Sequence, residues 1–249
     1  MVQPVFNVLN GVAVERNSNS QVENKANDGG VVTLTIFHTN DIHSRMLEST
    51  KRGVQCDDKA RKANKCFGGV ARIANVVRTL KNISGSSLFL NAGDFFQGTL
   101  WYSILKYNIV SAVMANMSYD TVCLGNHEFD DGPAGLVPFL LKMKEAGVTV
   151  LGTNLDTTEE PLFTNANITL PKSIIYNIAG TSVAILGVVT TETMTIAKPD
   201  AACQAIKAAK SCSSSYPTTV CTTPTTTVVF TSRGRFHIKH SSVPFAESP

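Results

Sequence analysis

Three polar clusters, each directly after a short apolar segment, are the feature that most constrains how this chain of 249 residues can fold. The apolar segments are typical of buried strands and cover residues 31–37, 87–90 and 121–124. Helical patterns occupy residues 70–83, 100–117 and 133–146, and further strand patterns occupy residues 148–151, 173–178 and 182–189. Strands that alternate with helices predict an α/β domain, in which functional residues collect on the loops at strand ends.

The first cluster is His38-Thr39-Asn40-Asp41-Ile42-His43-Ser44-Arg45. Asp41 and His43 are two positions apart after a strand, so both side chains can point the same way. A carboxylate and an imidazole arranged like this predict a site for zinc or a similar divalent ion. An Asx-type loop with incidental histidines is the alternative.

The second cluster is Asn91-Ala92-Gly93-Asp94, again at the end of a strand pattern. A tight loop of this kind presents the Asp94 carboxylate, and one carboxylate can bridge two metal ions that lie about 3.5–4 Å apart. A plain turn is the alternative, since Gly-Asp pairs are common in turns.

The third cluster is Gly125-Asn126-His127-Glu128-Phe129-Asp130. Asn126 offers a neutral oxygen ligand, and His127 can face a phosphate. Asp130 lies three residues further on, where it can hydrogen-bond His127 and favour the protonated ring. A helix N-terminus is the alternative, with Asn126 as the cap and Glu128 and Asp130 favoured by the helix dipole.

In this order the clusters read D-x-H, G-D and G-N-H-E, which is the metallophosphoesterase signature. The stretch from Val31 to Met194 resembles the N-terminal catalytic domain of the 5′-nucleotidase/apyrase family within that superfamily. The resemblance rests on HTNDIHSR, GGVARIANVVR, NAGDFFQGTLWYSILKYN, GNHEFDDG and VTVLGTNLD. Protein Ser/Thr phosphatases are less similar, because they have glycine where this chain has Ser44 and G-D-Y-V-D-R-G where it reads GDFFQGT.

The resemblance implies an α/β fold, the four-layer α/β/β/α sandwich of the metallophosphoesterases, incomplete here at its C-terminal side. It implies metal-dependent hydrolysis of a nucleotide such as AMP, ADP or ATP, with two divalent ions, zinc foremost and manganese, calcium or magnesium as alternatives. The implied metal ligands are Asp41, His43, Asp94 and Asn126, with Asp94 shared by both ions. The implied substrate-binding and catalytic residues are Asn40, Arg45, Asn126, His127 and Asp130. His127 would steady the negative charge that develops on the phosphate, and Asp130 would orient it.

Metal-binding histidines that the family carries later in its sequence, including a G-H-x-H motif, have no counterpart in this sequence. His237 and His240 lack the preceding glycine and have the wrong spacing, so we expect a solvated basic tail there rather than ligands. A second hypothesis therefore stays open beside the enzyme: a nucleotide binder without full activity, or an incomplete product.

The two ends of the chain differ from its middle. Residues 1–30 carry no clear signal peptide and are expected to be a disordered, Asn-rich lead-in. The phosphoesterase domain is expected over residues 31–200. From Ser211 to Ser232, 13 of 22 residues are Ser or Thr, with no lasting strand period beyond residues 227–230. Residues 201–249 are therefore expected to be an O-glycosylated stalk or a non-native tail.

The compartment and partners are constrained by a few further features. The net charge of +3 is too small to indicate nucleic acid, and no apolar run reaches the roughly 18 residues that span a bilayer. The resemblance implies an extracellular or cell-surface protein, and Cys56 and Cys66 lie in a loop that is often disulfide-bonded in animal members. Cys123 is expected to be a buried thiol. N-x-[ST] sequons occur at Asn82, Asn116 and Asn167, and they matter only in a secreted chain.

Overall fold

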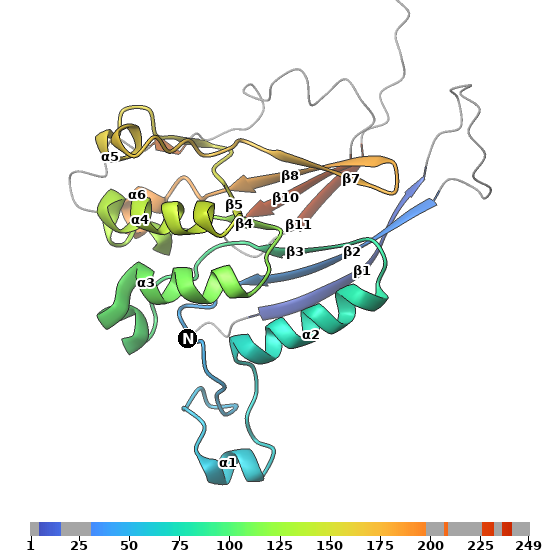
Figure 1. Ribbon diagram of the computed structural model, residues 1–249, viewed down its shortest axis with the longest axis vertical. Helices are drawn as coiled ribbons and strands as arrows, with labels where there is room; N and C mark the ends of the chain where they lie inside the picture. Colours follow the sequence, from blue (N-terminus) through green and yellow to red (C-terminus); the bar gives the residue numbers. More distant parts are fainter. Residues whose placement is uncertain (1–4, 16–30, 198–206, 209–225, 232–235, 241–249) are drawn as a thin grey trace, which may run out of the picture.

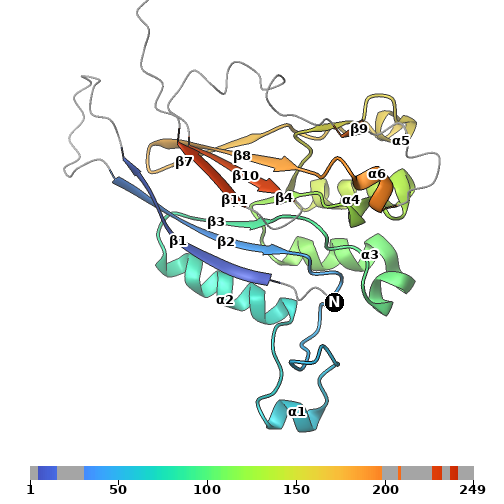
Figure 2. The same ribbon diagram turned by 180° about the vertical axis from the view of Figure 1, so that it is seen from behind.

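The computed structural model describes residues 5–15, 31–197, 207–208, 226–231 and 236–240. Two main sheets lie face to face, and the longer helices cover the outer side of one of them (Figures 1 and 2). None of the helices in these described ranges has both the length and the apolar character that crossing a membrane requires.

The first sheet has five strands in the order β1-β2-β3-β4-β5. They are β1 (Val5–Glu15), β2 (Val31–Asn40), β3 (Ser87–Asn91), β4 (Thr121–Cys123) and β5 (Thr149–Leu151). Strands β2 to β5 run parallel, whereas β1 is antiparallel to β2. The carboxyl ends of β2, β3 and β4 therefore meet at one edge of the sheet, and each is followed directly by one of the three polar clusters.

The second sheet has four strands in the order β11-β10-β8-β7. They are β7 (Ile174–Ile178), β8 (Thr181–Val188), β10 (Thr226–Thr231) and β11 (Phe236–His240). Strands β7 and β8 form the hairpin expected around Ala179-Gly180, and β10 joins β8 in parallel. A short ladder between β6 (Leu155–Asp156) and β9 (Lys207–Ala208) lies apart from both sheets.

The helices that shape the first sheet are α2 (Val70–Ile83), α3 (Leu100–Asn116) and α4 (Gly132–Glu145). They agree with the helical patterns of the sequence, including Gly69 at the start of α2 and Pro133 in the first turn of α4. Shorter helices are α1 (Asp58–Lys62), the 3-10 turn η1 (His127–Phe129), α5 (Pro161–Asn165) and α6 (Thr193–Ile196).

The pleat of the first sheet divides its buried side chains between two cores. On β3, Phe89 packs against the helices, whereas Leu88 and Leu90 pack against the second sheet. The helix-side core includes Val77 of α2, Val110 of α3 and Phe139 of α4, and the inter-sheet core includes Val183 and Ile185 of β8. Burial on both faces explains why these strands are short apolar runs rather than alternating ones.

Three expectations about the strands need correction. β2 continues to Asn40, beyond the expected apolar run of residues 31–37, because β1 and β3 both pair with its last residues. Val5–Glu15, which we expected in a disordered lead-in, forms β1. In the tail, where no lasting strand was expected, Thr226–Thr231 and Phe236–His240 extend the second sheet. The remaining parts of the predicted lead-in and tail lie outside the described residues.

Candidate active site

The three polar clusters converge at the carboxyl edge of the first sheet through backbone contacts. Asp41 N donates to Gly93 O (3.1 Å), and His43 N donates to Asp94 O (3.0 Å). Gly93 has φ +90°, and a Cβ on it would lie 2.3 Å from the backbone N of Gly125. Only glycine allows the second and third loops to approach this closely, so this residue fixes the distance between two parts of the site.

Asp41, His43 and Asp94 form a group whose side chains offer metal-ligand atoms, all within 4.8 Å of one another. The His43 Nε2 lies 3.6 Å from Asp41 Oδ1. Asp94 is 4% exposed, and the other two side chains are half-buried. Two carboxylates and an imidazole gathered in this partly buried group fit a divalent ion, because carboxylate and imidazole are ligands that such ions accept.

Asp41 and His43 lie side by side, as the sequence predicted, but the alternation of side chains along a strand is not the reason. Asp41 and His43 have φ values of 53° and 48°, so they do not continue the extended strand. A tight turn, rather than strand alternation, brings their side chains together.

Ser44 explains how this turn is maintained. Its φ is 48°, in the left-handed region that favours glycine, which is the residue found here in Ser/Thr phosphatases. The buried Ser44 hydroxyl donates to Gln97 O (2.8 Å) and contacts Thr99 Oγ1 (2.8 Å). These contacts to the loop that precedes α3 offset the backbone strain.

Glu128 has a role that the sequence interpretation missed. Its side chain is 2% exposed and accepts hydrogen bonds from four backbone N–H groups, those of Asp94, Phe95, Phe96 and Gly125. The carboxylate therefore holds the second loop against the third through these hydrogen bonds. The sequence alternative, a favourable interaction with a helix dipole, does not describe this role. No local signal in G-N-H-E predicts this burial, because a glutamate is almost never fully buried unless it is paired.

His127 lies on the rim of the group formed by Asp41, His43 and Asp94. Its ring centroid is 5.0 Å from that of His43, and its Nδ1 is 2.8 Å from Asp130 Oδ2. Its backbone N also donates to Asp94 Oδ1 (2.9 Å). The pair with Asp130 fixes the orientation of the ring, so that Nε2 is the nitrogen left for a ligand.

Asn126 and Asn40 lie next to the same group. Asn126 occupies the N-cap position of η1, as the helix alternative expected, but its side chain makes no capping hydrogen bond. Asn40 is 6% exposed and donates from Nδ2 to Asp41 Oδ2 (2.6 Å). Its Oδ1 is buried and has no hydrogen-bond partner among the described residues. Asn40 therefore orients the Asp41 carboxylate and offers a further polar atom.

Arg45 lies on the other side of the turn. Its Nε is buried and has no hydrogen-bond partner within the described ranges. It lines a cavity of about 540 Å³ together with Ser44, Thr99 and Trp101. Asp41, His43 and Asp94 do not line this cavity, so Arg45 borders the candidate site rather than joining its centre.

The electrostatics of the site follow from burial and neighbouring charges. Burial, with the Glu128 charge adding to it, raises the pKa of Asp94 to about 7. Hydrogen bonding to Asp130 raises the pKa of His127, and the contact with Asp41 raises the pKa of His43. Burial opposes ionisation of Asp41, but its contacts with His43 and Asn40 outweigh burial and lower its pKa.

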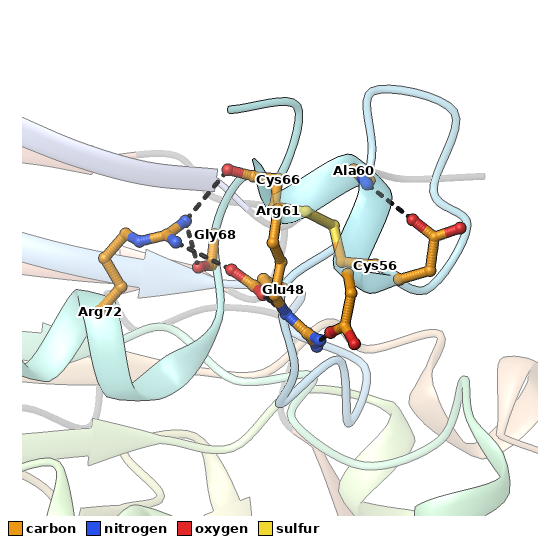
Figure 3. Close-up of a disulfide and its surroundings, with 9 residues drawn as sticks. Glu48, Cys56, Ala60, Arg61, Cys66, Gly68 and Arg72 are labelled. Carbon is orange, nitrogen blue, oxygen red and sulfur yellow. Dashed lines mark hydrogen bonds and ion pairs between the residues drawn. A yellow bond between two sulfur atoms is a disulfide. The ribbon is translucent and has the colours of Figure 1, made fainter. Parts of the chain in front are cut away.

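A disulfide-bonded loop precedes α2 (Figure 3). Cys56 and Cys66 are joined, with Cα atoms 6.0 Å apart, so the expected pairing is confirmed. Glu48 accepts from Arg61 Nε (2.5 Å) and Arg72 Nη2 (2.8 Å), which links the loop to the first turn of α2. Cys123 is a buried free thiol, as expected.

Comparison with known proteins identifies the family. Residues 34–178 match the family model described as calcineurin-like phosphoesterase. The chain is 42% identical over 171 residues to Protein 5NUC of Lutzomyia longipalpis, covering 68% of this chain and 29% of that protein. It is 38% identical over 166 residues to an apyrase of Tabanus yao, covering 67% and 28%. It is also 38% identical over 170 residues to a snake venom 5′-nucleotidase of Gloydius brevicauda, covering 68% and 28%. The chain thus spans less than a third of the length of these curated relatives.

Solved structures agree with the sequence match. The 5′-nucleotidase precursor of Thermus thermophilus superimposes with a TM-score of 0.63 at 29% identity, covering 80% of this chain and 36% of that one. The NAD nucleotidase of Haemophilus influenzae gives a TM-score of 0.57 at 27% identity, covering 71% and 29%. The expected metallophosphoesterase fold and the similarity to 5′-nucleotidases and apyrases are confirmed. Because the match covers more than half of the sequence and includes all three loops of the site, the chain belongs to the calcineurin-like phosphoesterase family.

Proposed function

We propose that this chain carries part of an active site that hydrolyses the phosphate ester or anhydride of a nucleotide with the help of two divalent metal ions. The observation that carries the proposal is the meeting of Asp41, His43 and Asp94 beside the His127–Asp130 pair. The first three side chains would bind cations, and His127 would donate a hydrogen bond to a phosphate held beside them.

The protein side of the metal site follows from its donor atoms. Asp41 and His43 would hold one ion, Asn126 would contribute to the other, and Asp94 would be shared between them. When bound, two divalent ions supply positive charge and activate water for attack on phosphorus. Zinc is the proposed metal, because it accepts both imidazole and carboxylate ligands, with manganese, calcium and magnesium as alternatives.

Positioning and charge stabilisation are proposed for the remaining residues. His127, with Nδ1 engaged by Asp130, would donate from Nε2 to a phosphoryl oxygen as negative charge develops there. Asn40 and Arg45, each with a buried polar atom that lacks a partner in the described part of the chain, would contact the phosphate from the side of the first loop.

The substrate class rests on the names of the relatives. A 5′-nucleotidase acts on nucleoside monophosphates and an apyrase on di- and triphosphates, so the proposed substrates are AMP, ADP or ATP. An extracellular or cell-surface location is proposed with it. The Cys56–Cys66 disulfide supports that location, because such bonds persist in oxidising compartments.

Phosphate release from AMP, ADP and ATP by the full chain, with each of the four metals, tests this proposal. Asp94→Asn is the informative variant, because it keeps an oxygen that can accept from His127 N and removes the buried charge. Asp58→Asn, on the exposed helix α1, is the matched control. We expect metal-dependent release that the first variant loses and the second keeps.

Equal release by the wild type and Asp94→Asn would contradict the proposed site. Binding of a nucleotide without release would favour the alternative of a non-catalytic nucleotide binder. Release that ranks AMP above ATP would indicate a nucleotidase, and the reverse ranking an apyrase.

A further inference from the structure

The three N-x-[ST] sequons all lie near the ends of helices, and none of their asparagines belongs to the proposed active site. Asn82 lies in the last turn of α2, Asn116 is the last residue of α3, and Asn167 follows the end of α5. The side chain of each is exposed. We propose that these three asparagines carry N-linked glycans, an inference that rests on the proposed extracellular location.

The topology of the first sheet keeps Asn82 and Asn116 away from the active site. The site lies at the carboxyl ends of β2, β3 and β4, whereas α2 and α3 end just before β3 and β4 begin. Asn82 and Asn116 are therefore at the opposite edge of the sheet, as Figure 1 shows for the ends of α2 and α3. Ile168 and Thr169, next to Asn167, line a cavity with Lys144 and Gly147 at the end of α4, which precedes β5. Glycans at Asn82 and Asn116 would therefore leave the edge that carries Asp41, His43 and Asp94 open.

The local structure around Asn116 and Asn167 is compatible with the modification. The transfer joins Asn Nδ2 to C1 of a sugar, breaks the bond from C1 to a lipid diphosphate donor, and releases one amide proton with that leaving group. Asn116 Nδ2 donates to Ala112 O (2.8 Å), and the amide hydrogen that remains after the transfer can keep that bond. Asn167 has φ 50°, a conformation that asparagine adopts more readily than most residues.

The disulfide gives independent support for exposure to the same compartment. Cys56 and Cys66 lie on a separate loop before α2, and their bond forms in the oxidising environment in which N-linked glycans are added. Two chemically unrelated features of the chain thus indicate one route of synthesis.

The test is expression of the full chain behind a secretion leader in insect cells, with both secreted and cell-retained protein analysed by mass spectrometry. Peptide N-glycosidase converts each glycan-bearing asparagine to aspartate, which identifies the site. We expect conversion at Asn82, Asn116 and Asn167, and the loss of one glycan from each of three single variants.

The variants are chosen to avoid strain. Asn82→Gln spares the Ser84 hydroxyl, which donates to Leu80 O (2.7 Å), and Asn116→Gln spares Ser118, whose φ is 61°. For the third site Thr169→Ala leaves the left-handed Asn167 in place. Asn75→Gln, at an exposed asparagine outside any sequon, should change nothing.

Unmodified asparagines in protein whose Cys56–Cys66 bond has formed would overturn the proposal for each site at which they are found. This result does not depend on catalysis. An inactive but glycosylated chain would contradict the proposed function alone, and an active but unglycosylated chain would contradict this inference alone.

Discussion

The buried Glu128 carboxylate accepts a hydrogen bond at 2.9 Å from the backbone N–H of Asp94, the residue whose own side chain is proposed to be shared by two metal ions. Two acidic residues that belong to different loops thus lie together in the interior. Glu128 holds the backbone that presents Asp94, while its charge helps to raise the pKa of Asp94. A cation above Asp94 would relieve this repulsion, which explains why a metal site can contain a carboxylate that the protein alone destabilises.

Replacing Glu128 with glutamine should destabilise the fold. The amide presents a donor where two backbone N–H groups now find an acceptor, and each buried group left unsatisfied costs about 1–3 kcal/mol. We expect the free energy of unfolding to fall by about 3 kcal/mol, measured by urea denaturation. Glu145→Gln, at an exposed residue of α4, should change it by less than about 0.5 kcal/mol. Equal losses in both variants would show that the four hydrogen bonds contribute little.

Replacing Asp130 with asparagine should lower the rate of phosphate release while the protein stays folded. The variant loses the carboxylate that orients His127, and partners of this kind are typically worth about 10–100-fold in activity. Asp131→Asn is the matched control, because Asp131 binds Tyr102 and Lys106 instead of His127. Steady-state kinetics of both variants decide the point, and a larger kcat loss in Asp131→Asn would contradict the orienting role of Asp130.

Zinc should stabilise the protein through Asp94. A ligand at about 100 times its Kd adds about 2.7 kcal/mol to the free energy of unfolding when it binds only the folded state. Thermal unfolding with and without a chelator should therefore show a higher Tm with zinc, and the increase should disappear in Asp94→Asn. The increase should persist in Asp58→Asn, and an unchanged shift in Asp94→Asn would contradict metal binding at this group.

Buried His38 should make the fold sensitive to acid. It is 2% exposed, and burial lowers its pKa from 6.5 to about 4. Between these values the unfolded chain binds the proton more readily, so the stability is present above pH 6.5 and is lost as the pH falls toward 4. The loss from this residue alone is about 3 kcal/mol. Between about pH 7 and about pH 4 the wild type should lose about 3 kcal/mol more unfolding free energy than His38→Gln, because the variant lacks this histidine. A constant difference would contradict the shift.

Much of the α/β framework could be predicted from local patterns. The ends of α2 are marked by Gly69 and by Ser84-Gly85, and β3 and β5 agree with apolar runs to within a residue. β1 could not be predicted in this way, because Asn7 and Asn10 interrupt its apolar residues and its pairing partner, β2, lies beyond residue 30. Strand pairing of this kind depends on a neighbour distant in sequence, which local periodicity does not encode.

The sequence by itself determined the chemical types at the site and their order, since Asp41, His43, Asp94 and His127 stand in a recognisable series at the ends of strand patterns. Only the tertiary structure decided how they meet. The close approach of Gly93 to Gly125, the left-handed turn at Ser44 and the burial of Glu128 all depend on contacts between loops more than 30 residues apart. Distances between side chains result from packing and hydrogen bonding across the fold, which is why the same residues read along the chain predict a metal but not its surroundings.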